Sequence, residues 1–174
     1  RMPNPEGKGG VSMLDLVINS LRMRPDRIIV GEIRRKEEAE VLLEAMHTGH
    51  SVYGTFHANN AEETVVRLTN PPISIPKPML SSVGFVLVQN RNRRSGKRRS
   101  LQVAEILPSG DSNVLLQLNV LEDKLYWKSE SKSVFKKLEL FTGLTPDEII
   151  KMKGLKQISN ESELITVITN ILQE

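Results

Sequence analysis

Apolar residues recur along the first part of the chain with two periods that alternate. A spacing of three and four residues, typical of an amphipathic helix, occurs in residues 12–22, 36–46 and 60–68. Between these stretches lie two short runs rich in β-branched residues, Arg27–Gly31 and Ser51–Phe56, and the first fits a buried strand of a parallel sheet. The order helix, strand, helix, strand, helix predicts an α/β fold with parallel strands.

Polar residues at the helix ends support these boundaries. Ser12 with Asp15, and Asn60 with Glu63, have the spacing of N-terminal capping pairs. Pro25 disfavours helical backbone at the residue before it, so the first helix should end ahead of the first strand.

The pattern changes beyond a proline-rich connector at residues 70–78. An apolar strand is expected at Phe85–Gln89. Short strands separated by turns then predict an antiparallel region, with strands at Leu101–Leu107, Val114–Val120 and Lys124–Trp127.

The remaining residues have helical patterns. Ser133–Phe141 is amphipathic, Thr145 with Glu148 resembles a capping box, and Asn160 is placed to cap a last helix. We therefore expect three parts: a core at residues 1–90, a β-rich appendage at 91–130 and a helical C-terminal region at 131–174.

Two polar residues, Glu32 and His57, come just past the ends of the two predicted strands. The carboxyl ends of neighbouring parallel strands lie at one edge of a sheet, where open α/β sheets bind ligands, so both side chains should face one crevice. A carboxylate there can align water or hold Mg²⁺ in nucleoside triphosphatases, and a histidine can donate to a phosphate oxygen. Taken singly, Glu32 also fits a surface carboxylate, and His57 a histidine bonded to a backbone carbonyl.

A metal site is a second, less favoured interpretation of the histidines. His47, His50 and His57 lie near Glu44 in the sequence, but their spacings fit no standard zinc pattern. His47 and His50 also flank a predicted helix C-terminus, where the helix dipole favours a cation. The chain has no cysteine, so thiolate ligands and disulfides are excluded.

The composition is that of a globular protein. The 174 residues are 39 % hydrophobic and 26 % charged, enough for one compact domain with a buried core. No apolar run approaches the roughly 20 residues that cross a bilayer, and no signal peptide is recognised. These features favour a cytoplasmic protein.

The net charge is +3, and the basic excess is local. Six of the nine residues from Arg91 to Arg99 are basic. Such a run fits a contact for nucleic acid, phosphate or an acidic lipid surface. The favoured interpretation is a solvated turn between two strands, since no aromatic residue interleaves with the run as base stacking would require.

Two stretches resemble a known family. "SLRMRPDRIIVGEIR", followed by "AMHTGHSVYGTFHANN", is similar to the Walker B region and histidine box of the secretion ATPase superfamily. These proteins are the hexameric motors of type II and type IV secretion, type IV pili and archaella, and the first part of the chain is most similar to archaeal members. The resemblance is dense over residues 1–90 and implies the C-terminal part of a RecA-like P-loop ATPase core.

The resemblance also implies roles for single residues. Glu32 matches the Walker B glutamate, which polarises the attacking water or contacts Mg²⁺ through water. His57 matches the histidine near the γ-phosphate, His50 matches the TGH histidine, and Arg34 follows the glutamate at the family's position.

The family's phosphate-binding loop is not found. No stretch matches G-x-x-x-x-G-K-[ST], and Lys8 in "EGKGG" lacks the spacing. In the family this loop precedes the segment with which the present sequence starts. We therefore expect the C-terminal part of an enzyme that uses ATP and Mg²⁺, inactive by itself. The tetracysteine zinc motif of some bacterial members is absent too.

For the full protein the resemblance implies a hexamer at the cytoplasmic face of the membrane, working with an inner-membrane platform protein in secretion or filament assembly. Arg22 matches an arginine near a subunit boundary that could act in trans as an arginine finger, and Arg1 has the same implied role on a weaker match. Two alternatives stay open: a non-catalytic oligomerisation fragment, or a nucleic-acid-binding fragment that uses residues 91–99, nucleic acid being the less favoured partner.

Overall fold

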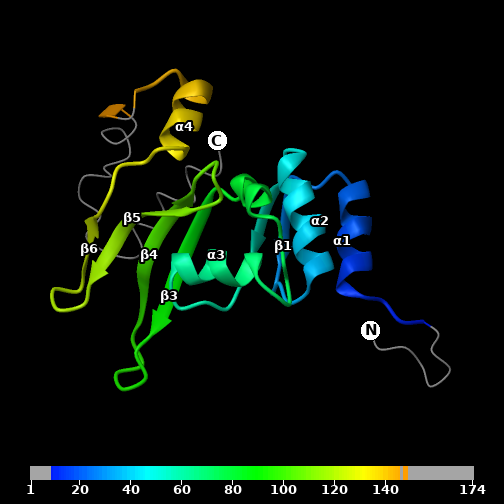
Figure 1. The fold of residues 1–174 in the computed structure, drawn as a ribbon, viewed down its shortest axis with the longest axis horizontal. Coiled ribbons are helices and arrows are strands. Elements are labelled where there is room, and N and C mark those ends of the chain that lie inside the picture. Colours follow the sequence, from blue (N-terminus) through cyan, green and yellow to red (C-terminus); the bar gives the residue numbers. More distant parts are fainter. Residues whose placement is uncertain (1–8, 146, 149–174) are drawn as a thin grey trace.

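The structure is a computed structural model that describes residues 9–145 and 147–148. Figure 1 shows two groups of elements side by side, a pair of parallel strands with two helices and an antiparallel sheet with its own helices. The helices are α1 (Met13–Arg22), α2 (Lys36–His47), α3 (Ala61–Thr69), the 3₁₀ helix η1 (Lys77–Ser82) and α4 (Val134–Thr142). The strands are β1 (Arg27–Val30), β2 (Ser51–Gly54), β3 (Phe85–Arg91), β4 (Arg98–Ile106), β5 (Ser112–Asn119) and β6 (Lys124–Trp127).

The predicted caps are present. The Ser12 hydroxyl accepts the Asp15 N–H at 3.1 Å, and the Asp15 carboxylate accepts the Ser12 N–H at 2.9 Å, which completes a capping box. Asn60 accepts the Glu63 N–H at 2.7 Å at the start of α3. Thr145 and Glu148 also bond reciprocally. The helices expected beyond residue 148 lie outside the described residues.

Strands β1 and β2 pair in parallel, with Ile28 opposite Val52, as the sequence predicts. β2 ends at Gly54, two residues before the predicted end. Helices α1 and α2 cover one face of this pair, where Ile28 and Val30 form a buried cluster with Val17 and Leu42.

The prediction that β1 is a buried strand is wrong for one of its faces. Ile29 points away from α1 and α2, and 79 % of its surface is exposed. The alternation arises because, in the described part of the chain, the β1–β2 pair has its helices on one face and no further strand beside β1.

The second sheet is antiparallel, in the order β3-β4-β5-β6. The strand expected at residues 85–89 belongs to this sheet and not to the parallel pair. α3 packs on it through Ala61, which is buried against Val88 and Ala104. A larger apolar cluster, including Leu43, Val65, Ile75 and Ile106, joins α2, α3 and β4, so the two groups of elements share a core.

Buried Glu105 on β4 connects this sheet to α4. Its carboxylate accepts the backbone N–H groups of Lys132 (2.6 Å), Ser133 (3.1 Å) and Val134 (3.0 Å) at the start of the helix. The side chains of Asn113 and Ser131 also donate to it. A buried charge is tolerated here because the carboxylate accepts hydrogen bonds from three backbone and two side-chain donors.

No helix among the described residues is both long and apolar enough to cross a membrane.

Candidate functional site

Glu32 and His57 meet at the carboxyl edge of the parallel pair. Glu32 lies two residues past β1 and His57 three residues past β2, and the Nε2 atom of His57 is 3.1 Å from Oε1 of Glu32. The two side chains differ in exposure: 24 % of the Glu32 side chain and 83 % of the His57 ring are accessible. The carboxylate is thus partly sheltered, while the imidazole faces solvent.

Backbone and hydroxyl contacts hold the two strand ends together. The Thr55 hydroxyl donates to the Gly31 carbonyl, and the Ile33 N–H donates to the Thr55 carbonyl at 3.0 Å. These bonds extend the pairing beyond the ladder, so the loops that carry Glu32 and His57 are fixed relative to each other.

Arg34 completes a cluster of three charged or titratable side chains. Its Nε atom donates to Oε2 of Glu32 at 2.7 Å, so each oxygen of the carboxylate has its own basic partner. The hydrogen bond from Arg34 is the main reason that the pKa of Glu32 lies below its ordinary value. Partial desolvation opposes this shift, and the charges of Arg34 and His57 reinforce it. Glu32 is therefore an anion at neutral pH, suited to bind water or a cation and unsuited to act as an acid.

An open groove of about 1070 Å³ lies on one side of this carboxylate. Its walls are the first turn of α1, with Ser12 and Asp15, and the start of α2, with Arg35 and Glu38. Glu38 accepts the N–H groups of Arg34 and Arg35 at 3.0 and 3.1 Å, which fixes the loop after Glu32.

The α1 wall of this groove was not among the predicted site residues, although the sequence contains the signal for it. A helix that precedes a strand and packs against it by a short connection runs antiparallel to that strand. The capping box at Ser12 therefore had to lie beside the carboxyl end of β1.

His50 lies away from this cluster. It precedes β2, so it sits at the opposite edge of the parallel pair from Glu32 and His57. Its N–H donates to the Ala45 carbonyl at 3.0 Å, and its Nδ1 lies 3.3 Å from the Thr48 hydroxyl. In this chain His50 therefore joins the end of α2 to the start of β2.

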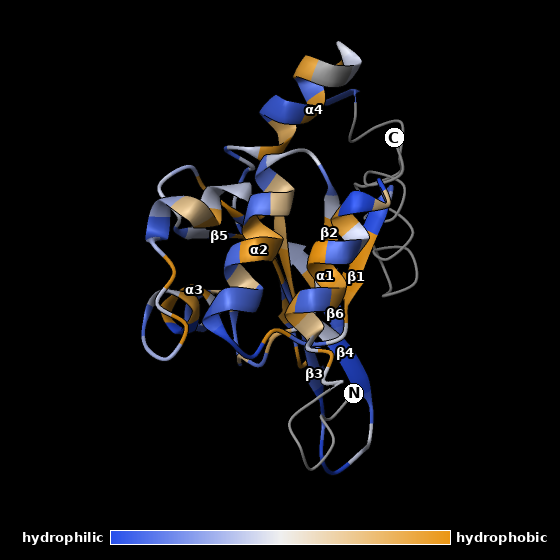
Figure 2. Cartoon of the chain, turned by 90° about the vertical axis from the view of Figure 1, so that its right-hand side faces the viewer, coloured by the Kyte–Doolittle hydropathy of each residue, from blue (hydrophilic) through white to orange (hydrophobic). Residues whose placement is uncertain are grey.

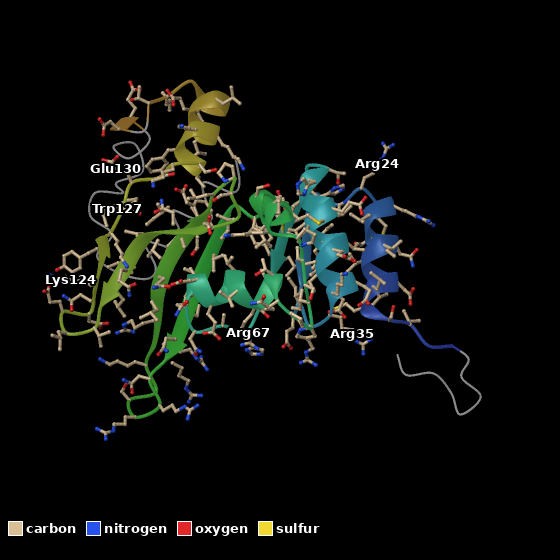
Figure 3. The ribbon with its side chains drawn as sticks, in the orientation of Figure 1. Arg24, Arg35, Arg67, Lys124, Trp127 and Glu130 are labelled. Atoms are coloured by element: carbon tan, nitrogen blue, oxygen red, sulfur yellow. The ribbon has the colours of Figure 1, made fainter. Side chains whose placement is uncertain are left out.

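Arg22, one of the two proposed arginine fingers, is also remote from Glu32. Arg22 is in the last turn of α1, whose first turn lines the groove. Figure 3 shows Arg24 and Arg35 at opposite ends of the layer formed by α1 and α2. Arg1 lies outside the described residues.

The described residues contain no group of three or more metal-binding side chains. The site suggested by the sequence fails because His57 lies at one edge of the strand pair and His50 at the other, while His47 bonds the Leu43 carbonyl in α2. Glu32 alone offers one carboxylate. That donor set fits Mg²⁺, which commonly takes one or two carboxylates and fills its other positions with water and phosphate oxygens.

Comparison with known proteins identifies relatives of the chain. The family model described as type II/IV secretion system protein matches residues 2–110. An uncharacterised protein of Methanocaldococcus jannaschii is 35 % identical over 148 residues, which cover 80 % of this chain and 54 % of that protein. The type IV pilus assembly ATPase PilB of Acinetobacter baylyi is 40 % identical over 104 residues, 59 % of this chain and 18 % of the relative.

Among solved structures, the Legionella pneumophila ATPase DotB is 30 % identical over a match that covers 54 % of this chain and 27 % of the DotB chain, with a TM-score of 0.46. The chain spans about half the length of the first of these relatives and less of the others. The parallel pair, the antiparallel sheet and the flanking helices confirm the expected α/β class. The family match covers well over half of the chain and includes Glu32 and His57, and it confirms the resemblance seen in their motifs: the chain belongs to the type II/IV secretion system protein family.

Proposed function

We propose that this chain is the C-terminal part of an ATPase motor that powers type II/IV secretion or the assembly of a type IV filament. One observation carries the proposal: Glu32 and His57, which match the Walker B glutamate and the histidine box, are 3.1 Å apart at the carboxyl edge of two parallel strands. This edge is where nucleotides bind in open α/β sheets.

Each residue of the cluster has a distinct proposed task. Glu32, kept ionised by Arg34, would orient the attacking water and would be the residue that holds Mg²⁺, directly or through water. Bound Mg²⁺ would neutralise charge on the phosphate oxygens. His57 is exposed on the solvent side of the carboxylate, and we assign to it the contact with the terminal phosphate.

In the proposed cycle the loop of His57 exchanges partners. His57 would contact either Glu32 or the terminal phosphate, so gain and loss of the phosphate would move its loop. Arg34, which bonds the other oxygen of the same carboxylate, would sense this change through Glu32. His50, at the far edge, transmits movement of β2 to α2 through its bonds to Ala45 and Thr48.

A larger core is part of the proposal. The sequence has no phosphate-binding loop of the G-x-x-x-x-G-K-[ST] type, and the relatives are longer than this chain. The exposed face of β1, with Ile29, is suited to receive the rest of such a core, and residues 1–90 would be its final portion. Residues 91–130 and 131–174 would then be a β-rich appendage and a helical region. Without the missing loop, nucleotide should bind this chain very weakly.

We propose that ATP hydrolysis also requires assembly of several subunits, in addition to the larger core. In a hexamer at the cytoplasmic face of a membrane, Arg22, and with it Arg1, would reach the neighbouring subunit's nucleotide as arginine fingers. Such an arginine raises the rate of other nucleoside triphosphatases by about 10³–10⁵. An integral-membrane platform protein would receive the resulting movement.

The test uses the full-length protein that contains this chain. Glu32→Gln removes the anion but keeps the size of the side chain, and it should lower ATP turnover by about 10² or more while nucleotide binding persists. Glu44→Gln, an exposed carboxylate in the last turns of α2, is the matched control and should leave turnover unchanged. Normal turnover in Glu32→Gln would leave only a non-catalytic role in oligomerisation.

His57 needs its own measurement, because its proposed task is to couple hydrolysis to movement. In the full-length protein, His57→Ala should either suppress ATP turnover or leave turnover that no longer supports secretion or filament assembly. His47→Ala, which removes a ring bonded within α2, is the control. Normal turnover together with normal assembly in His57→Ala would refute the role.

A further inference from the structure

The turn between β3 and β4 carries a concentrated positive charge that the proposed function does not use. Residues 91–98 are all exposed, and the hairpin projects beyond the rest of the sheet, with nitrogen-tipped side chains spread around its end (Figure 3). The same end is mostly hydrophilic and has no hydrophobic colour (Figure 2). Its cations are Arg91, Arg93, Arg94, Lys97 and Arg98.

The turn has a defined shape. Asn92 accepts the N–H groups of Arg94 and Ser95 at 2.9 and 3.0 Å, and its own N–H donates to the Lys97 carbonyl at 2.8 Å. Gly96 closes the turn with a φ of 68°. The cations are therefore presented from a fixed backbone.

Arg99 does not belong to this charged tip. Its Nε and Nη2 atoms donate to the two oxygens of Asp123 at 2.7 Å each, which ties the base of the hairpin to the β5–β6 turn. None of the five cations at the tip lies within ion-pair distance of a carboxylate in the described part of the chain, although Lys97 is near enough for its charge to lower the pKa of Asp123.

The pairing of β3 with β4 places like charges together, which destabilises the hairpin. Arg91 lies directly opposite Arg98 across the antiparallel pair, and like charges in that position destabilise a sheet. The cost falls when an anionic surface supplies the missing counter-charges. Four of the five cations are arginines, whose guanidinium groups bind phosphate through two parallel hydrogen bonds.

We propose that the tip of this hairpin, residues 91–98, is an electrostatic contact for the phosphate head groups of anionic lipids. The tip has no aromatic side chain on which single-stranded nucleic acid could stack, and no large apolar side chain that would enter a bilayer. Clusters of four to eight basic residues attract anionic membrane surfaces in this way. The choice of a membrane over duplex nucleic acid rests on the proposed function, because secretion takes place at a membrane.

The experiment measures sedimentation of the full chain with vesicles of phosphatidylglycerol and phosphatidylcholine in equal parts, without nucleotide. Changing all five cations of the tip to Gln should weaken binding about tenfold or more. The control removes the same charge by changing to Gln five exposed lysines of β6, of α4 and of the segment between them, namely Lys124, Lys128, Lys132, Lys136 and Lys137. It should weaken binding less than about threefold, because its charges are spread along the chain.

Additional variants and ligands show whether a loss of vesicle binding comes from charge, from misfolding or from a preference for nucleic acid. Changing the four tip arginines to Lys keeps the charge and should retain most of the binding, and circular dichroism checks that each variant is folded. Vesicles of phosphatidylcholine alone should not bind. Equal losses in the tip and control variants would overturn the proposal. So would tighter binding to a random duplex DNA than to the vesicles at the same salt concentration, which would assign the tip to nucleic acid.

This test is independent of catalysis. The tip variant should keep the ATP turnover of the full-length protein in solution, because residues 91–98 do not line the groove beside Glu32. A failure of vesicle binding with normal turnover would refute the lipid contact alone, and a failure of the Glu32→Gln test with intact vesicle binding would refute the catalytic proposal alone.

Discussion

At the scale of single residues, the protonation of Glu32 depends on two basic neighbours that contribute unequally. The hydrogen bond from Arg34 is the main cause of the lowered pKa, and His57 contributes less. Arg34→Ala should therefore raise the pKa of Glu32 towards its ordinary value, and by more than His57→Ala does. A ¹³C NMR titration of the Glu32 carboxyl carbon measures both shifts.

Arg35→Ala is a control for this titration. The Arg35 side chain lines the same groove but forms no ion pair with Glu32. This substitution should leave the titration of Glu32 nearly unchanged. A larger shift in His57→Ala than in Arg34→Ala would show that the imidazole, and not the guanidinium, holds the carboxylate in its ionised form.

Gly110 shows how strongly one residue can constrain a turn. Its φ is 80°, and a Cβ atom at this position would lie 2.3 Å from the Lys77 carbonyl oxygen. Gly110→Ala should lower the free energy of unfolding by about 3 kcal/mol, from left-handed strain and the steric clash together. Gly96 also has a positive φ but open space around it, so Gly96→Ala should cost only about 1 kcal/mol. Urea denaturation of both variants makes the comparison, and equal losses would mean that the clash is relieved by a small shift of the backbone.

At the scale of secondary-structure elements, α4 is attached to the sheet through Glu105. Replacing this buried carboxylate by Gln leaves one acceptor oxygen and puts an NH₂ group against N–H donors. Glu105→Gln should therefore lower the free energy of unfolding by about 2–4 kcal/mol. Hydrogen exchange should show faster exchange of the N–H groups of Lys132 and Val134, which donate to the carboxylate. Glu130→Gln, with an exposed side chain two residues before Lys132, is the control, and similar exchange rates in both variants would contradict the attachment.

The same contact predicts a pH dependence. Burial by itself would raise the pKa of Glu105, but the hydrogen bonds from the backbone of Lys132 and Val134, and from Asn113 and Ser131, bring it below the ordinary 4.5. A carboxyl whose folded pKa is lowered stabilises the fold above its unfolded pKa, and this stabilisation is lost as the pH falls through the folded pKa. The unfolding free energy should thus fall below about pH 4.5 in the native chain, and by less in Glu105→Gln. Parallel pH profiles of the two proteins would contradict this.

Elements with local signals could be predicted from the sequence, and contacts between distant segments could not. Ser12 with Asp15, and Asn60, mark helix starts through bonds within one turn, and Ile28–Val30 is recognisable by composition. The burial of Glu105 was not predictable, because four of its donors come from residues 26 to 29 positions later. The meeting of Glu32 with His57 was predictable because it follows from parallel pairing alone, whereas the exposure of Ile29 depends on what lies on the second face of β1.

At the scale of the whole molecule, the parallel pair has one covered and one exposed face. Ile28 is 5 % exposed beneath α1 and α2, while its neighbour Ile29 is 79 % exposed on the other face. Our proposal that this chain completes a larger core requires Ile29 to be buried in the full-length protein. The two isoleucines therefore form a matched pair that reports on each face separately.

Ile29→Ser should consequently behave differently in two proteins. In the isolated chain it removes a side chain already in water, so the unfolding free energy should change by less than about 0.5 kcal/mol. In the full-length protein the same substitution should cost about 2–4 kcal/mol, because it places a hydroxyl in an apolar contact and leaves a cavity. Ile28→Ser should be destabilising in both. Chemical denaturation of the four variants measures this, and a harmless Ile29→Ser in the full-length protein would mean that the exposed face of β1 stays in solvent and that the rest of the core lies elsewhere.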